Sequence, residues 1–92
     1  MNEEKKLEQI AKILDQLIED TSVPRNIRKS AEEAKLTLLD KNKDIGVRIS
    51  SAIYILEEIS NDRNLPLHAR TLVWNIASEL ETVKPWKRKY NT

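Results

Sequence analysis

The segment that spans residues 40–46 has the oxygen spacing of a calcium-binding loop. Asp40, Asn42 and Asp44 place side-chain oxygens at alternate positions, as an EF-hand loop does where it begins to surround a hard cation. Two later positions depart from that pattern, because Ile45 stands where glycine is expected and Ser51 stands where a bidentate glutamate is expected. Two interpretations remain open: a weak Ca²⁺ site, or a turn in which Asp44 caps the next helix.

Residues 84–92 form a basic C-terminal tail. Within it, Trp86 is followed by Lys87, Arg88 and Lys89, so an aromatic ring lies beside a run of cations. Because cations meet phosphates and aromatic rings stack on unpaired bases, this tail could serve a nucleic-acid-contacting accessory protein. In the alternative interpretation, Trp86 covers the open end of the folded domain and the charged side chains stay in solvent.

His68 and Trp74 are two further side chains that we weigh as functional candidates. His68 is the single histidine of the chain and there is no cysteine, so the usual zinc ligand sets and a catalytic triad cannot be assembled around it. We therefore expect His68 to be a surface or turn residue. Trp74 lies beside an apolar helical stripe, which favours a position at the edge of the core; the alternative is an exposed anchor for a partner.

A charged turn motif occurs twice, at an offset of 42 residues. Its members are Asp20, Pro24 and Arg28 in the first half of the chain, and Asp62, Pro66 and Arg70 in the second half. One interpretation is a pair of symmetric charged binding sites. We favour a structural one, in which the Asp that ends one helix forms an ion pair with the Arg that begins the next, because a turn that is needed twice is encoded twice. An exposed ion pair of this kind contributes only about 0–1 kcal/mol.

Four segments have the hydrophobic periodicity of amphipathic helices, and they position these motifs. The expected helices run from Glu3 to Asp20, from Pro24 to about residue 40, after Asp44 from residue 45, and from Pro66 to a stop at Pro85. Asn2 can cap the first helix, and proline suits the first turn of the second and fourth. The residues expected in the core are Leu7, Ile10, Ala11, Leu14, Leu17, Ile18, Ile27, Ala31, Ala34, Leu38, Ile45, Ile49, Ala52, Ile53, Leu56, Ile59, Ala69, Leu72, Val73, Ile76 and Leu80.

Four large apolar or aromatic residues lie off these stripes. They are Leu36, Leu39, Val47 and Tyr54. If these side chains share a second apolar face, self-association through that face is expected.

The repeat predicts an all-α fold built from two αα-hairpins, about residues 3–40 and 44–83. A period of 42 residues is similar to that of HEAT-type helical repeats. Two copies are too few for an open solenoid, because each unit leaves an apolar face that must be covered. Short connections make neighbouring helices antiparallel, so we expect an up-down-up-down four-helix bundle over residues 1–83, followed by the tail 84–92.

Composition narrows the class of function. The chain has 92 residues, 34% of them charged, and a formal net charge of +1, which does not suit a nucleic-acid-binding domain as a whole. It contains no apolar run that could span a membrane and no signal-peptide pattern, so we expect a cytoplasmic protein. The balance of Glu, Lys, Ile and Leu also suits a thermophile. No phosphate-binding loop or paired catalytic residues are present, so we expect a non-catalytic module that binds a protein partner or a second copy of itself.

The length, the four-helix pattern and the two Asp-x-x-x-Pro-x-x-x-Arg turns resemble a family of small uncharacterised archaeal proteins. The resemblance covers essentially the whole chain. It implies a helical, cytoplasmic protein, and it brings no catalytic residues, cofactor or assigned activity.

Overall fold

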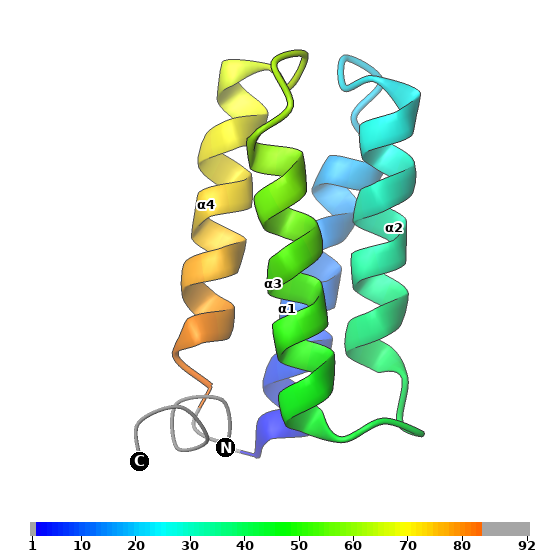
Figure 1. The fold of residues 1–92 in the computed structure, drawn as a ribbon, viewed down its shortest axis with the longest axis vertical. Coiled ribbons are helices and arrows are strands. Elements are labelled where there is room, and N and C mark those ends of the chain that lie inside the picture. Colours follow the sequence, from blue (N-terminus) through cyan, green and yellow to red (C-terminus); the bar gives the residue numbers. More distant parts are fainter. Residues whose placement is uncertain (1, 84–92) are drawn as a thin grey trace.

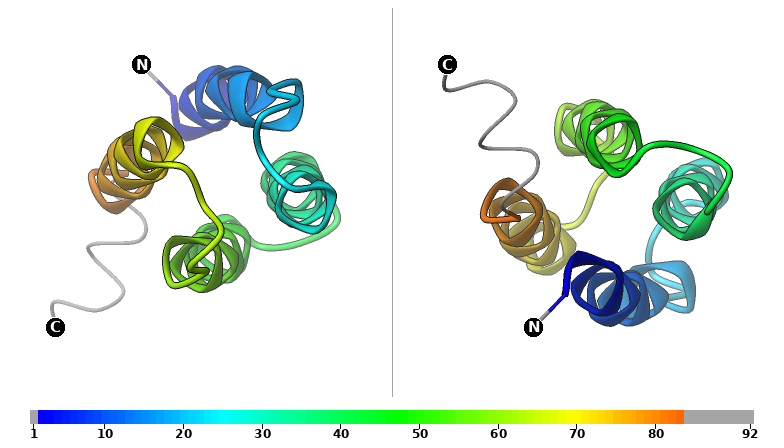
Figure 2. Two further views of the ribbon diagram at one scale, coloured as in Figure 1. Left: turned by 90° about the horizontal axis from the view of Figure 1, so that it is seen from above. Right: turned by 90° about the horizontal axis from the view of Figure 1, so that it is seen from below.

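Four α-helices make up most of residues 2–83, which are the residues that this computed structural model describes. They are α1 (Glu3–Ile18), α2 (Arg25–Leu39), α3 (Ile45–Ser60) and α4 (Leu67–Glu81). The helices alternate in direction (Figure 1), and each packs against the next, with α4 returning to α1. Seen along its length, the bundle is a ring of four helices (Figure 2), which leaves α1 and α3 diagonally opposite. The all-α bundle predicted from the sequence is therefore confirmed.

Local signals in the sequence place the helix starts. The side chain of Asn2 accepts a hydrogen bond from the Lys5 amide at 2.8 Å and caps α1. Asp44 caps α3 in the same way, accepting from the Gly46 amide at 3.2 Å. Pro24 and Pro66 each stand one residue before their helix, at the cap position and not inside the first turn. The predicted starts are therefore correct to within one residue.

The helix ends depart more from expectation. We predicted that the first helix reaches Asp20, but α1 ends at Ile18. The Asp20 amide donates to the carbonyl of Leu17 at 3.3 Å, so the chain has already tightened from four-residue to three-residue spacing. The last helix, α4, ends at Glu81. Its predicted stop, Pro85, lies outside the described residues.

The core is filled by one apolar stripe from each helix. The fully buried apolar residues are Leu7, Ile10, Ala11, Leu14, Leu17, Val23, Ile27, Ala31, Ala34, Leu38, Ile49, Ala52, Ile53, Leu56, Ile59, Leu65, Ala69, Val73, Ile76, Leu80 and Val83. Val23 and Leu65 lie in the connections before α2 and α4, and Val83 lies just after α4. All three pack against the ends of the core. Ile18, Ile45 and Leu72, which we also predicted to be buried, are half-buried and pack against the edge of this core.

Candidate functional site

All three connections between helices contain the same side-chain hydrogen bond. In each connection an aspartate accepts from the backbone amide two residues later, which makes an Asx turn. The pairs and their N–O distances are Asp20 with Ser22 (2.9 Å), Asp40 with Asn42 (3.0 Å) and Asp62 with Asn64 (2.8 Å). The carboxylates of Asp20 and Asp62 are therefore engaged by their own turns.

An arginine eight residues after each of these aspartates donates to a backbone carbonyl. Arg28 donates Nε–H to the carbonyl of Val23 at 3.0 Å, and Arg70 donates to the carbonyls of Ser60 and Asp62. Our prediction that Arg28 pairs with Asp20, and Arg70 with Asp62, is wrong: neither ion pair forms among the described residues. Carbonyls at helix ends and in the connections have no partner within a helix, and the guanidinium groups satisfy these carbonyls instead of the aspartates.

The middle connection contains a third copy of the motif, which we missed. Asp40 and Arg48 have the same spacing as the other two pairs, but Asp44 stands where those have proline. Arg48 donates to the carbonyl of Leu38 at 3.1 Å, as Arg70 does to that of Ser60, ten residues earlier in both cases. The Asp-x-(Ser/Asn) start and the Arg eight residues after the Asp are the signals that could have revealed it.

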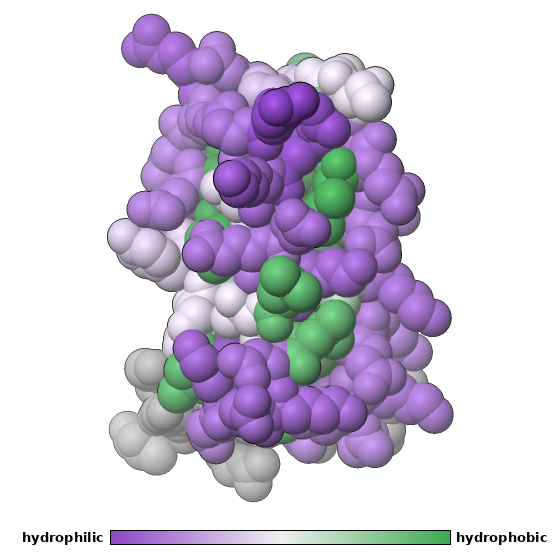
Figure 3. All heavy atoms as spheres, turned by 90° about the vertical axis from the view of Figure 1, so that its right-hand side faces the viewer, coloured by the Kyte–Doolittle hydropathy of each residue, from purple (hydrophilic) through white to green (hydrophobic). Residues whose placement is uncertain are grey.

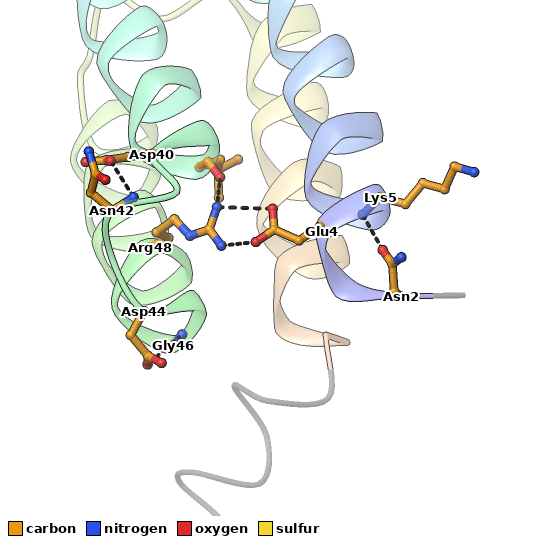
Figure 4. Close-up of polar contacts among 9 residues, drawn as sticks. Asn2, Glu4, Lys5, Asp40, Asn42, Asp44, Gly46 and Arg48 are labelled. Carbon is orange, nitrogen blue, oxygen red and sulfur yellow. Dashed lines mark hydrogen bonds and ion pairs between the residues drawn. The ribbon is translucent and has the colours of Figure 1, made fainter.

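Arg48 also makes an ion pair with Glu4 of α1 (Figure 4). The two terminal nitrogens of its guanidinium face the two oxygens of the Glu4 carboxylate, in the bidentate arrangement that favours charge-assisted hydrogen bonds. The Arg48 side chain is 2% exposed, whereas that of Glu4 is 40% exposed. The hydrogen bond from Arg48 lowers the pKa of Glu4. The sequence pattern assigned no role to Arg48, because a charged residue in a helix is ordinarily exposed.

The predicted calcium loop is built as a turn followed by a cap. One oxygen of Asp40 accepts from the amide of Asn42, and one oxygen of Asp44 accepts from that of Gly46 (Figure 4). Within residues 2–83, no three side chains of His, Cys, Asp or Glu converge in a way that could hold a metal ion. The turn and the cap thus account for Asp40 and Asp44 without a metal, which favours the second interpretation over a weak Ca²⁺ site at Asp40, Asn42 and Asp44.

His68, in the first turn of α4, contacts the connection between α1 and α2 at one end of the bundle. Its Nε2 lies 2.8 Å from Asp20 Oδ2 and 3.4 Å from the Ser22 hydroxyl, which itself donates to Asp20 Oδ1 at 2.6 Å. The Ser22 hydroxyl and His68 lower the pKa of Asp20 to about 2. Ser, His and Asp meet here, but a catalytic triad needs Ser and Asp on opposite ring nitrogens. Both contact Nε2 in this cluster, so the histidine cannot relay a proton between them.

Several exposed apolar side chains lie on the outer side of α2 and at its border with α3. Leu36 and Tyr54 are each 62% exposed and Val47 is 41% exposed, while Leu39 is half-buried. Hydrophobic side chains interrupt the otherwise hydrophilic surface on this side (Figure 3). We call this surface the α2–α3 face. It consists of a stripe along α2 and an adjoining open groove, which share Glu33 and Thr37. The residues that line the stripe and the groove are Asn26, Lys29, Ser30, Glu32, Glu33, Leu36, Thr37, Asp40, Ser50, Ser51, Tyr54, Ile55 and Glu58.

Trp74 is not at the edge of the core as we favoured. Its side chain is 63% exposed, whereas its neighbour Val73 is buried, because successive residues of a helix point about 100° apart. Trp74 borders an open groove of about 310 Å³ between α3 and α4.

The other candidate interaction residues, Trp86, Lys87, Arg88 and Lys89, lie in the tail outside the described residues. No helix within residues 2–83 is both long and apolar enough to cross a membrane.

The chain is similar in sequence to several archaeal proteins of one family. The chain is 55% identical over 78 residues to a UPF0147 protein of Methanocaldococcus jannaschii, covering 85% of this chain and 84% of that protein. It is 50% identical over 84 residues to one of Pyrococcus horikoshii, with 90% of each chain covered.

Two crystal structures have the same fold. One, of a protein of unknown function, has a TM-score of 0.85 and 46% sequence identity, over 90% of this chain and 94% of that one. The other, of a UPF0147 protein from Thermoplasma acidophilum, has a TM-score of 0.81 and 34% identity, over 87% and 94% of the two chains. The model of the uncharacterised protein family UPF0147 matches residues 1–83. The family described by these matches is archaeal, and its description names no activity. The chain therefore belongs to the uncharacterised protein family UPF0147.

Proposed function

We propose that this protein is a non-catalytic module that binds another protein through the α2–α3 face. The observation that carries the proposal is the exposure of Leu36 on α2 and of Tyr54 on α3. The exposed side chain of Val47 lies seven residues before Tyr54, about two helical turns, and so points to the same side of α3. A single exposed apolar side chain is ordinary, but several on one side of a small domain favour an interface. Covering such side chains contributes about 25 cal/mol for each Å² of apolar surface removed from water.

The residues around these side chains also suit an interface. Thr37, Ser50 and Ser51 line the middle of the α2–α3 groove, and the charged residues Glu33 and Glu58 stand beside them. Interfaces are depleted of charge at the centre, enriched in tyrosine and polar at the rim. The α2–α3 face shares the tyrosine and the uncharged polar residues of such interfaces, although Glu33 lies where the stripe and the groove meet.

The chemistry of the described residues supports a non-catalytic role. Asp20 and Arg70 are engaged in turns, and Arg48 joins two helices. The arrangement of Ser22 and His68 does not provide a nucleophile with a base. The grooves on the surface are open, whereas small-molecule sites usually bury most of their ligand.

Site-specific photocrosslinking in an archaeal cell tests the proposal. Tyr54 is replaced by a benzophenone amino acid, and the same replacement of Trp74, which has nearly the same exposure on another face, is the control. We expect a discrete protein adduct from position 54 that is lost when Leu36→Glu is added. Adducts from position 74 alone would move the interface to the α3–α4 groove, and no adduct from either position would refute the proposal.

A further inference from the structure

We infer that the α2–α3 face binds a second copy of this chain, with the two α2 helices packed antiparallel. This inference rests on the proposed function and names the partner. The argument begins with one line of side chains on the outer surface of α2. Lys29, Glu33, Leu36 and Asp40 follow at intervals of three or four residues, so they share one side of the helix. Lys29, Glu33 and Leu36 are exposed, and Asp40 is half-buried.

The two end residues of this line, Lys29 and Asp40, have complementary charges when a second α2 helix lies antiparallel to the first. Its midpoint falls between residues 34 and 35, with Lys29 and Asp40 at equal distances on either side. A two-fold axis through the midpoint places Lys29 of one copy against Asp40 of the other, twice in each dimer. A parallel arrangement in register would instead place Lys29 on Lys29, Glu33 on Glu33 and Asp40 on Asp40, whereas the antiparallel arrangement leaves only the two Glu33 side chains near a like charge.

The same axis brings the apolar side chains together. In the antiparallel arrangement, Leu36 of one copy lies opposite Glu33 of the other. The two Leu36 side chains are therefore offset by three residues, about 4.5 Å along the helix axis. Leu36 then covers the aliphatic part of Glu33 in the other copy. Tyr54 stands in the adjoining groove, next to the line. Both charged pairs lie at the ends of the contact, where they set orientation more than affinity.

The size of the surface indicates a weak dimer. Helix α2 has 15 residues and is about 22 Å long. A contact centred on one helix of this length falls at the lower end of specific interfaces, below about 1,200 Å² in total. We therefore expect dissociation constants in the micromolar to millimolar range, so association must be measured across a wide range of concentrations.

Sedimentation equilibrium of the full chain from about 10 µM to about 1 mM is the first experiment. We expect a concentration-dependent change from monomer to dimer. Lys29→Glu should weaken the dimer about ten-fold, since both charged pairs become repulsive. The matched control is Lys12→Glu, an exposed change of the same charge on α1, which should leave the dimer unchanged. A chain that remains monomeric at about 1 mM would overturn the inference.

Cysteine crosslinking tests whether the two α2 helices are antiparallel. Because the chain has no native cysteine, each introduced cysteine is the single site that the reagent can crosslink. With a short bismaleimide reagent, Glu33→Cys should give a covalent dimer, because the two positions are three residues apart in register. Asn26→Cys on the same face should not, because its two copies are 17 residues apart, about 25 Å along the axis. Crosslinking of both variants would indicate a parallel dimer, which contradicts the inference.

The two proposals fail in different ways. A monomeric chain that still forms the Leu36-dependent adduct from position 54 would refute self-association and leave the proposed function standing. A chain with neither adduct nor self-association would refute both.

Discussion

Arg48 of α3 and Glu4 of α1 form an ion pair between helices that are diagonally opposite in the bundle. Each of these helices packs mainly against α2 and α4, so the pair joins two elements that share few other contacts. Arg48 also donates to the carbonyl of Leu38 at the end of α2. One buried side chain thereby connects three of the four helices at the end of the bundle where the chain begins.

Loss of Arg48 should therefore destabilise the whole bundle. We expect Arg48→Ala to lower the free energy of unfolding by about 2–4 kcal/mol, because it removes buried packing and leaves the Leu38 carbonyl without its donor. Glu4→Gln should cost less, and the double variant should cost less than the sum of the two, since the residues interact directly. Urea denaturation measures all three values. Strictly additive effects would contradict a direct interaction in solution.

Acid should remove the contribution of Asp20. The pKa of this carboxyl falls from 3.8 to about 2 on folding, owing first to the Ser22 hydroxyl and then to His68. Because the folded value is the lower one, the stabilisation is fully present above about pH 4 and is lost as the pH falls through 2. Asp20→Asn should flatten the dependence of Tm on pH in this window. The exposed neighbour variant Glu19→Gln is the control, and equal slopes for both variants would contradict this assignment.

The arginine–carbonyl contacts should stabilise the turns without help from aspartate charge. Arg70→Met removes the donors to the carbonyls of Ser60 and Asp62 and should lower stability by about 1–2 kcal/mol. Arg63→Met, an exposed change in the same connection, should have little effect. Raising the salt concentration should change the Arg70 effect little, because the contacts are hydrogen bonds to neutral carbonyls and not ion pairs. Thermal melts at low and high salt measure this difference.

Calcium should not bind the 40–46 loop in a saturable manner. Asp40 and Asp44 already accept backbone hydrogen bonds, and no bidentate glutamate follows at the twelfth position. An NMR titration with Ca²⁺, with Mg²⁺ for comparison, should give only small shifts spread over acidic surfaces. Saturable shifts confined to Asp40–Gly46 would contradict this expectation and show that the loop binds Ca²⁺. In either case Asp44→Ala should cost about 1 kcal/mol through loss of the helix cap.

The sequence by itself determined the elements of this protein. Asn2 and Asp44 cap helices through hydrogen bonds to amides two or three residues away, and the buried stripes repeat every three or four residues. Both signals are local, so they can be read without knowing how the helices pack. Pro24 and Pro66 predict helix starts for the same reason, since a fixed φ acts on its own segment.

Only the tertiary structure decided which charged and aromatic side chains meet. Arg48 is buried because α1 supplies Glu4 from 44 residues away, and His68 reaches Asp20 across 48 residues. Trp74 is exposed because the packing of α4 turns Val73, and not its neighbour, toward the core. Such contacts depend on the relative position of helices that are distant in the chain, and helical periodicity carries no information about it. The sequence named Leu36, Val47 and Tyr54 as a possible second apolar face, but only the packing of α2 beside α3 brought them to one side of the bundle.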